Sequence, residues 1–314
     1  MGIRWRGTQV FDGTVDASSA TKIGLGGDGY ALAGGRTYYV DMSNGSDGQR
    51  GTNPKDPLQT ITTAMDKCVA GQGDAIVVMA ASPSSPAAAE TFPIAMDVAG
   101  VLLTGLYSRG LLSDSGFGTD VLDGDTITPT ANYCNVENLY LGVKTGGTAG
   151  NVIAGTTSCY AFTLRNCLIE NQYTALYGFY TGASADFPYL LIEDNKFGGS
   201  SATACFTSAI SLFNATFGMV RRNLFMGCSS YAIHVLATCG QCCFLDNRFQ
   251  LYADTDGFAI YAADGSSNNY FDGNRAAHGM STITNDPFWD ANGDDSNDWG
   301  LNYENQAATS GIAA

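Results

Sequence analysis

One short pattern recurs six times in this sequence at a nearly constant spacing. Each copy has an apolar residue, two mostly polar residues, a fourth position held by Asn, Cys or Leu, one spacer and a second apolar residue. The copies are 136–141, 164–169, 192–197, 220–225, 244–249 and 271–276. Their fourth positions fall at 139, 167, 195, 223, 247 and 274, so the step from copy to copy varies little. A period of this length is typical of a solenoid, in which each repeat packs against its neighbours.

The type of solenoid follows from what the repeat lacks. Leucine-rich repeats need an L-x-x-L-x-L-x-x-N core and usually a helix, and this chain shows neither. The segments between the copies are short, β-rich and punctuated by Gly, Ser and Thr, without a helical period. The repeat therefore predicts an all-β, single-stranded parallel β-helix, a solenoid with rungs of about 24–28 residues.

Two columns of the alignment are expected to be structural. The fourth column contains Asn195, Asn223, Asn247 and Asn274. Asn tolerates the left-handed backbone region and suits a bend, and stacked Asn side chains would bond one another along the solenoid. The second column reads Glu137, Arg165, Glu193 and Arg221. On parallel rungs about 4.8 Å apart, these alternating charges predict a ladder of ion pairs.

The upstream segments resemble the opening of a known fold family. In order they are Gly35–Asp41, Asn44–Gly48, Pro57–Ala64, Gly73–Val78 and Val101–Gly105. This order resembles right-handed parallel β-helix proteins of the pectate-lyase-like superfamily, over roughly 37–280. The superfamily includes secreted polysaccharide lyases and hydrolases and the spike-like proteins of tailed bacteriophages. The resemblance implies the right-handed fold; these segments are architectural and imply no particular activity.

A short capping helix is expected near 60–70. Ile61, Ala64, Met65 and Cys68 follow Thr60, a good N-cap, at helical spacing. Such a helix would cover the open apolar end of the solenoid. We therefore divide the chain into an attachment or oligomerisation arm (1–36), the β-helix (37–280) and an acidic C-terminal cap or tail (281–314).

The net charge and the cysteine content exclude several classes of function and indicate where the protein folds. The formal charge is −15, which disfavours binding to nucleic acid or anionic membranes, and no apolar run approaches the ~20 residues of a membrane span. The first residues show no signal peptide, and nine cysteines are an odd number, so we expect reduced thiols in a protein folded in a cytoplasm.

With the resemblance, these features favour a spike, fibre or decoration protein on the virion surface of a tailed bacteriophage, assembled in the host cytoplasm. Its partners would be other virion proteins, bound through the arm, and host-surface carbohydrate; the resemblance implies a homotrimer.

The third column offers the candidate catalytic residues. Asp194, Arg222 and Asp246 lie on three successive rungs, so the two carboxylates would be ~9.6 Å apart. That distance is near the upper end for an inverting acid–base pair, about 6.5–9.5 Å. Arg222 could bind a uronate or neutralise both acids. The calcium-binding aspartates of the superfamily's lyases are not matched, so we expect a protein without enzymatic activity; the alternative is a polysaccharide depolymerase, either a glycoside hydrolase or a lyase.

The acidic C-terminal region contains a candidate calcium loop. Its oxygen ligands would be Asp290, Asn292, Asp294 and Asp298. The segment departs from the EF-hand pattern, because Asp295 replaces the needed Gly and Leu301 the bidentate Glu. The alternative is a solvated acidic cap in which Phe288, Trp289 and Trp299 cover the last rung. No other cofactor is expected.

Overall fold

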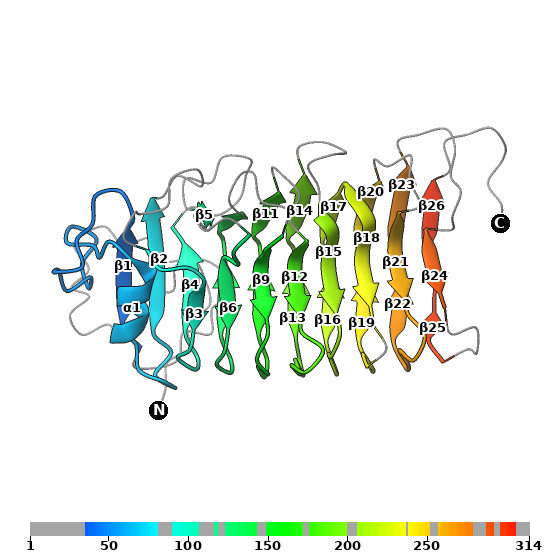
Figure 1. Cartoon of the computed structure of the whole chain (residues 1–314), viewed down its shortest axis with the longest axis horizontal. Coiled ribbons are helices and arrows are strands. Elements are labelled where there is room, and N and C mark those ends of the chain that lie inside the picture. Colours follow the sequence, from blue (N-terminus) through cyan, green and yellow to red (C-terminus); the bar gives the residue numbers. More distant parts are fainter. Residues whose placement is uncertain are drawn as a thin grey trace, which may run out of the picture.

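The computed structural model describes residues 35–80, 90–106, 116–118, 123–142, 149–171, 176–199, 206–236, 238–251, 257–278, 287–291 and 296–305. These residues form a right-handed parallel β-helix, in which three sheets run along one long axis (Figure 1). The predicted fold class is confirmed. No helix among the described residues is long and apolar enough to span a membrane.

Among the described residues the central rungs contribute one strand to each sheet, and sheet 1 has two more strands than either of the others. Sheet 1 contains β1 (Thr37–Asp41), β2 (Ala75–Ala80), β4 (Leu102–Gly105), β7 (Asn135–Glu137), β10 (Thr163–Arg165), β13 (Leu191–Glu193), β16 (Met219–Arg221), β19 (Cys243–Leu245), β22 (Tyr270–Asp272) and β25 (Asp298–Trp299). Sheet 2 contains β5 (Gly116–Gly118), β8 (Tyr140–Gly142), β11 (Leu168–Asn171), β14 (Lys196–Gly199), β17 (Leu224–Met226), β20 (Arg248–Leu251), β23 (Arg275–His278) and β26 (Tyr303–Asn305). Sheet 3 contains β3 (Ile94–Met96), β6 (Ile127–Pro129), β9 (Asn151–Gly155), β12 (Tyr177–Thr181), β15 (Phe206–Leu212), β18 (Cys228–Val235), β21 (Phe258–Ala262) and β24 (Phe288–Asp290).

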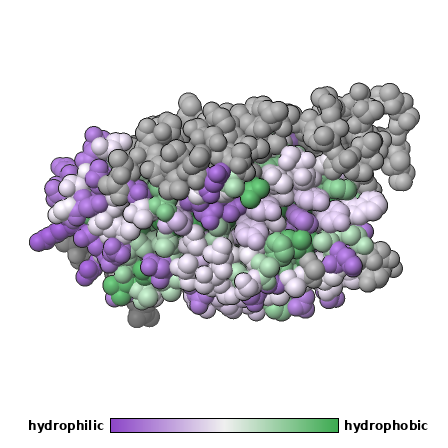
Figure 2. All heavy atoms as spheres, viewed as in Figure 1, coloured by the Kyte–Doolittle hydropathy of each residue, from purple (hydrophilic) through white to green (hydrophobic). Residues whose placement is uncertain are grey.

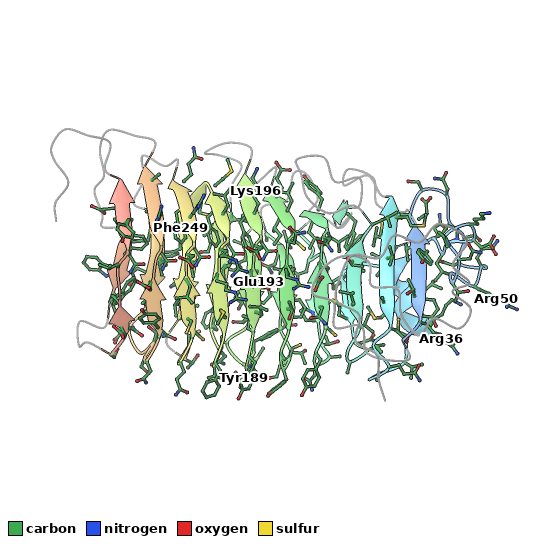
Figure 3. The ribbon with its side chains drawn as sticks, turned by 180° about the vertical axis from the view of Figure 1, so that it is seen from behind. Arg36, Arg50, Tyr189, Glu193, Lys196 and Phe249 are labelled. Carbon is green, nitrogen blue, oxygen red and sulfur yellow. The ribbon has the colours of Figure 1, made fainter. Side chains whose placement is uncertain are left out.

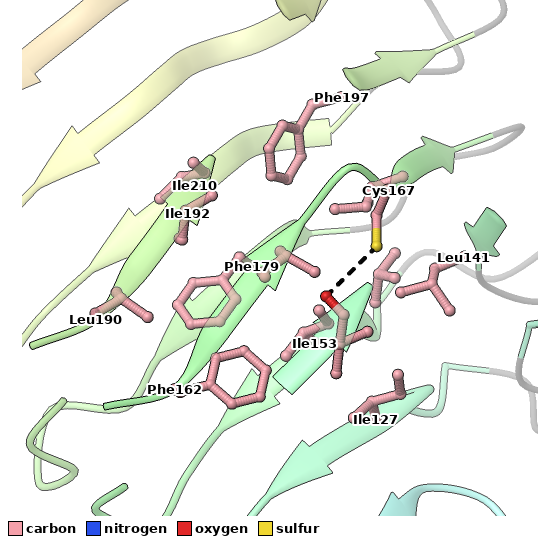
Figure 4. Packing of buried hydrophobic residues seen from close by; sticks show 14 of the residues in the cluster. Ile127, Leu141, Ile153, Phe162, Cys167, Phe179, Leu190, Ile192, Phe197 and Ile210 are labelled. Carbon is pink, nitrogen blue, oxygen red and sulfur yellow. Dashed lines mark hydrogen bonds between the residues drawn. The ribbon is translucent and has the colours of Figure 1, made fainter. Parts of the chain in front are cut away.

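The apolar ends of the repeated pattern form the core. The first position lies on sheet 1 and the sixth on sheet 2, and both point inward in register from rung to rung. On sheet 2, Phe197, Phe225 and Phe249 stack with ring centroids 5.1 and 4.9 Å apart. Figure 4 shows residues of all three sheets meeting in this interior, among them Ile192 of sheet 1, Leu141 of sheet 2 and Phe179 of sheet 3. Stacking of like side chains is what a parallel register favours.

The bend between sheets 1 and 2 corrects one detail of the sequence analysis. The left-handed residue is the third position of the pattern, which has φ of 53° to 68° in all six copies. The six residues are Asn138, Asn166, Asp194, Arg222, Asp246 and Gly273. The asparagine of the fourth position comes directly after the bend and is buried. Its role is therefore hydrogen bonding in the interior, while the preceding residue accepts the left-handed conformation.

The buried asparagines form a continuous ladder. Asn223 Nδ2 donates to Asn247 Oδ1 (3.1 Å) and to the Ile192 carbonyl (2.9 Å). Asn223 Oδ1 accepts from the backbone N–H and the Nδ2 of Asn195 (3.0 and 3.1 Å). The same contacts recur at Asn247 and Asn274 and end at Asn302.

The charged column lies on the outer side of sheet 1. Arg165 pairs with Glu137 (2.9 Å), and Arg221 pairs with Glu193 (2.7 Å). Figure 3 shows Glu193 in this central band of charged side chains, between Tyr189 at one edge and Lys196 at the other. These contacts place the alternating charges in an ion-pair ladder.

The two ends of the core are covered differently. At the N-terminal end, α1 (Ile61–Lys67) buries Ile61, Ala64 and Met65, and the Thr60 side chain accepts from the Thr63 N–H. The predicted capping helix and its N-cap are thus confirmed. At the other end Trp299 stacks on Phe271 with a centroid separation of 4.1 Å. Of the predicted arm, residues 1–34 lie outside the described residues.

Candidate functional site

Sheet 3 carries a second sequence pattern. Four of its strands contain an outward residue, a small inward residue, a large inward residue and a second outward residue. The four segments are Tyr177-Gly-Phe-Tyr180, Ser208-Ala-Ile-Ser211, Tyr231-Ala-Ile-His234 and Phe258-Ala-Ile-Tyr261. Both middle residues of each segment are buried, and the large one belongs to the core. The first and fourth residues therefore point away from the core, although Ser208 and Ser211 are themselves buried, each 1% exposed.

These outward positions make an aromatic face, defined here as Tyr177, Tyr180, Tyr231, His234, Phe258 and Tyr261. Tyr177 and Tyr180 stack at 4.9 Å, and Tyr231 and His234 stack at 4.3 Å. Tyr231 also stacks on Phe258 of the next rung (5.8 Å). The strands of sheet 3 cross the view of Figure 1, and in the same view the surface over them is mostly of intermediate hydropathy (Figure 2).

Two unpaired polar atoms lie in the same columns. In the part of the chain that the structure describes, the buried side-chain atoms without a hydrogen-bond partner are Ser211 Oγ and Asn151 Oδ1. Ser211 stands in register between Tyr180 and His234, and Asn151 is in register with Tyr177. A buried hydroxyl without a partner costs about 1–3 kcal/mol, so it needs an explanation. Both atoms are buried, so a ligand at this face would satisfy them only if neighbouring side chains move aside to admit its hydrogen-bonding groups.

The aromatic face is uncharged. Burial lowers the pKa of His234 to about 4, so its imidazole is neutral at physiological pH. Burial also raises the pKa of Tyr177 and Tyr231, which keeps both phenols protonated. Among the described outward positions of β9, β12, β15, β18 and β21 there is no Asp, Glu, Lys or Arg. These side chains can stack on a ligand and hydrogen-bond it, but they offer no carboxylate pair for acid–base catalysis.

The repeat alignment does not reveal this face. The four segments begin at 177, 208, 231 and 258, an uneven spacing, because the connections from sheet 2 to sheet 3 differ in length between rungs. The usable signal is local: an aromatic or Ser residue, Gly or Ala, a large apolar residue, and again an aromatic residue, Ser or His.

The structure places the predicted catalytic residues elsewhere, at the left-handed bend between sheets 1 and 2. Arg222 donates to both carboxylate oxygens of Asp194 (2.9 and 2.8 Å) and to Glu193 Oε2 (2.9 Å). These hydrogen bonds and charges, those of Asp194 first, raise the pKa of Arg222. Asp246 is on the next rung and has no ion pair with Arg222 among the described contacts. The arrangement is a closed ion-pair cluster rather than two carboxylates facing across a substrate.

The candidate calcium loop is only partly described. Asn292 and Asp294 lie outside the described residues. Asp290 Oδ2 accepts from Trp299 Nε1 (2.9 Å) and Asn297 Nδ2 (3.0 Å), and Asp298 begins β25. Within the described ranges no three His, Cys, Asp or Glu side chains are grouped closely enough to hold a metal ion.

The chain is similar in fold to solved structures of low sequence identity. No protein-family model matches the chain. No curated protein matches it either. A GH136 lacto-N-biosidase from Eubacterium ramulus has a TM-score of 0.52 at 13% identity, over 86% of this chain and 68% of its own. A pectin methylesterase mutant in complex with a hexasaccharide has the same TM-score at 10% identity, over 87% and 90%. Such identities establish the fold alone, and a phage tailspike with a TM-score of 0.30 adds no argument.

Proposed function

We propose that this chain is a carbohydrate-binding β-helix without catalytic activity, whose binding surface is the aromatic face. The observation that carries the proposal is the unpaired, buried Ser211 hydroxyl within a column of Tyr and His rings. The apolar faces of sugar rings pack on aromatic side chains, and sugar hydroxyls would pair with Ser211 and Asn151 after neighbouring side chains move to expose these two atoms. The comparisons support the ligand class, since one of the similar structures holds a hexasaccharide and the other is a lacto-N-biosidase.

The test combines affinity with stability. Soluble glycans are screened on an array, and the best one is titrated against Ser211→Ala and Tyr231→Ala. Ser211→Ala should bind at least tenfold more weakly and yet unfold at the same or a higher temperature, because it removes an unsatisfied buried hydroxyl. Tyr270→Ala, at an aromatic residue 38% exposed on sheet 1, is the matched control and should retain affinity.

The same experiment tests the alternative function, a polysaccharide depolymerase. Asp194→Asn and Asp246→Asn should leave glycan binding unchanged, and no variant should change the release of sugar ends. Release of sugar ends by the wild type that both substitutions abolish would replace the binding proposal with a depolymerase. Unchanged affinity of Ser211→Ala, or an array without any bound glycan, would exclude the aromatic face as the binding surface.

We place this binding protein on the virion surface of a tailed bacteriophage, as a spike, fibre or decoration protein. The support is the resemblance described above, and the arm at 1–36 is the proposed attachment to other virion proteins. Deletion of 1–36 should prevent incorporation into virions while the truncated chain still binds glycan. Incorporation without these residues would contradict the anchor.

A homotrimer is the proposed oligomeric state. One feature supports self-association: four exposed aromatic side chains form a line on the turns from sheet 3 to sheet 1. They are Tyr133, Tyr160, Tyr189 and Phe217, with successive ring centroids 5.3, 5.0 and 5.3 Å apart. Light scattering after size exclusion should give a trimer mass; a monomer would contradict this.

A further inference from the structure

Four aromatic side chains follow one edge of the solenoid, where the chain turns from sheet 3 to sheet 1. We name Tyr133, Tyr160, Tyr189 and Phe217 the aromatic line. These residues are between 37% and 55% exposed, and successive ring centroids are 5.0 to 5.3 Å apart. Figure 3 shows Tyr189 at this edge of the ribbon. The line therefore forms a ridge of exposed rings that is three rungs, or ~14 Å, long.

The backbone conformation along the line is unfavourable for aromatic residues. Tyr133, Tyr189 and Phe217 have φ of 61°, 59° and 55°, in the left-handed region that bulky residues rarely adopt. On the next two rungs the same position of the turn is held by Gln241 and Asn268. Asn is the easier choice there, because it tolerates this conformation and prefers water. Exposed and strained aromatic residues at such a turn indicate a surface that contacts a partner.

The turns beside the line carry acidic side chains. Asp186 is exposed three residues before Tyr189, and Asp97, also exposed, has the equivalent position three rungs earlier. The described segments of these turns contain no Lys or Arg; they are 96–102, 130–135, 156–163, 182–191 and 213–219. A partner that combines apolar rings with positive charge would therefore complement this surface in both respects.

The first residues of the chain have this composition. The segment 1–11 contains two arginines and no acidic residue, and its large apolar side chains include Ile3, Trp5, Val10 and Phe11. An extended segment of about five residues covers the ~14 Å of the line. The stretch 12–34, which joins this segment to the first described residue before β1, can span up to ~75 Å. The segment is therefore long enough to cover the line, and its tether is long enough to reach a neighbouring copy.

We propose that the segment 1–11 of one copy docks on the aromatic line of a neighbouring copy. The inference rests on the proposed homotrimer and names the contact that joins its copies. A ring of three copies needs a heterologous contact, in which two different surfaces meet. Two lines packed on each other would instead form an isologous pair, which gives a dimer, and would bring their acidic flanks together.

Each part of the segment has a defined role in this contact. Trp5 packs against the rings of the line, because aromatic side chains bury a large apolar area. Arg4 and Arg6 make charge-assisted hydrogen bonds with the flanking carboxylates, of which Asp186 is beside the middle of the line. The arm at 1–36 thus serves oligomerisation as well as attachment.

The experiment measures the mass of the full chain and its variants by light scattering after size exclusion. The wild type should have three times the chain mass of 32.9 kDa. Deletion of 1–11 and the line variant, Tyr189→Asn/Phe217→Asn, should each lower the mass threefold. The line variant should fold, because Asn suits the positive φ at both positions, and far-UV circular dichroism checks this. The matched control is Tyr270→Thr/Tyr303→Thr, which removes two exposed aromatic side chains from strands and should remain trimeric.

Two further measurements test the partners of the contact. The deleted chain keeps an intact line and the line variant keeps an intact 1–11, so an equal mixture of the two should form pairs of twice the chain mass. Arg4→Glu/Arg6→Glu should abolish the trimer, and adding Asp97→Arg/Asp186→Arg should restore it, because the charges are then exchanged across the contact.

Several results would overturn the inference. A trimer that persists without 1–11, or in the line variant, would overturn it and leave the proposed homotrimer intact, whereas a monomeric wild type would overturn both. Two monomeric variants that do not pair on mixing would place the segment on the line of its own chain. A dimeric wild type that stays dimeric without 1–11 would assign the line to the line of a second copy. Failure of the exchanged charges to restore the trimer would contradict the pairing of the segment with the acidic flank.

Discussion

Replacing Asn223 with alanine should lower the free energy of unfolding by about 4 kcal/mol or more, because the substitution removes several buried hydrogen bonds that each stabilise the fold. The side chain is 1% exposed and makes four hydrogen bonds, two to other asparagine side chains and two to backbone groups. At about 1 kcal/mol for each bond, the loss is about 4 kcal/mol. The Asn195 N–H and the Ile192 carbonyl also lose these buried partners, and an unsatisfied buried group costs ~1–3 kcal/mol, so the sum is a lower bound.

Urea denaturation followed by far-UV circular dichroism measures this loss. The midpoint should fall while the slope m stays constant, which shows that the variant unfolds over the same surface. Asp246→Asn is the control, because it changes an exposed residue at φ 54°, where Asn is equally tolerated. A destabilisation below about 1 kcal/mol for Asn223→Ala, or one equal to that of Asp246→Asn, would refute the argument that the ladder stabilises the fold.

Three further outcomes are expected. Glu193→Gln should cost about 2 kcal/mol in the same denaturation assay, because Arg221 and Arg222 lose a carboxylate whose side chain is 6% exposed; no loss would mean that the ladder is neutral. Burial raises the pKa of Cys167 to about 12, so this thiol should react with a disulfide reagent at pH 8 only after unfolding; labelling in the folded state would contradict its burial. The folded pKa of His234, about 4, is below its unfolded value of ~6.5, so the unfolded state binds more protons and stability should fall as pH drops from about 6.5 towards 4. His234→Phe should remove that component of the pH dependence, and an identical profile would contradict it.

The repeat predicts the path of the backbone well because the two apolar positions of the pattern face one shared core. Val220 on sheet 1 and Phe225 on sheet 2 are both buried. Only one register lets the next rung bury its own two apolar residues beside them. The error concerns the bend. Asn is frequent in the left-handed region, so Asn223 could be expected there, whereas Arg222 occupies it (φ 54°). Asn223 is buried because its side chain bonds within the ladder, and the residue before it, Arg222, adopts the left-handed conformation instead.

The candidate sites were harder to predict because they depend on columns that the core does not constrain. Tyr189 and Phe217 fall outside the repeated pattern, and only the register shows that they stand on adjacent rungs of one line. On sheet 3, the step in sequence from Ser211 to its partner His234 is shorter than the step between the same two rungs on sheet 1, from Glu193 to Arg221. Variable connections hide such columns until the strands are aligned in space.

The alternation of charge on sheet 1 bears on errors in assembling the coil. The rungs share a similar apolar core, and the rungs of Asn195, Asn223, Asn247 and Asn274 also share the asparagine contacts. A coil that left out one rung would therefore satisfy most of these interactions. That omission would place Glu137 beside Glu193, or Arg165 beside Arg221, where the native coil has opposite charges in contact. Like charges directly opposite destabilise paired strands. The charges thus distinguish odd from even rungs, which the apolar interior alone does not.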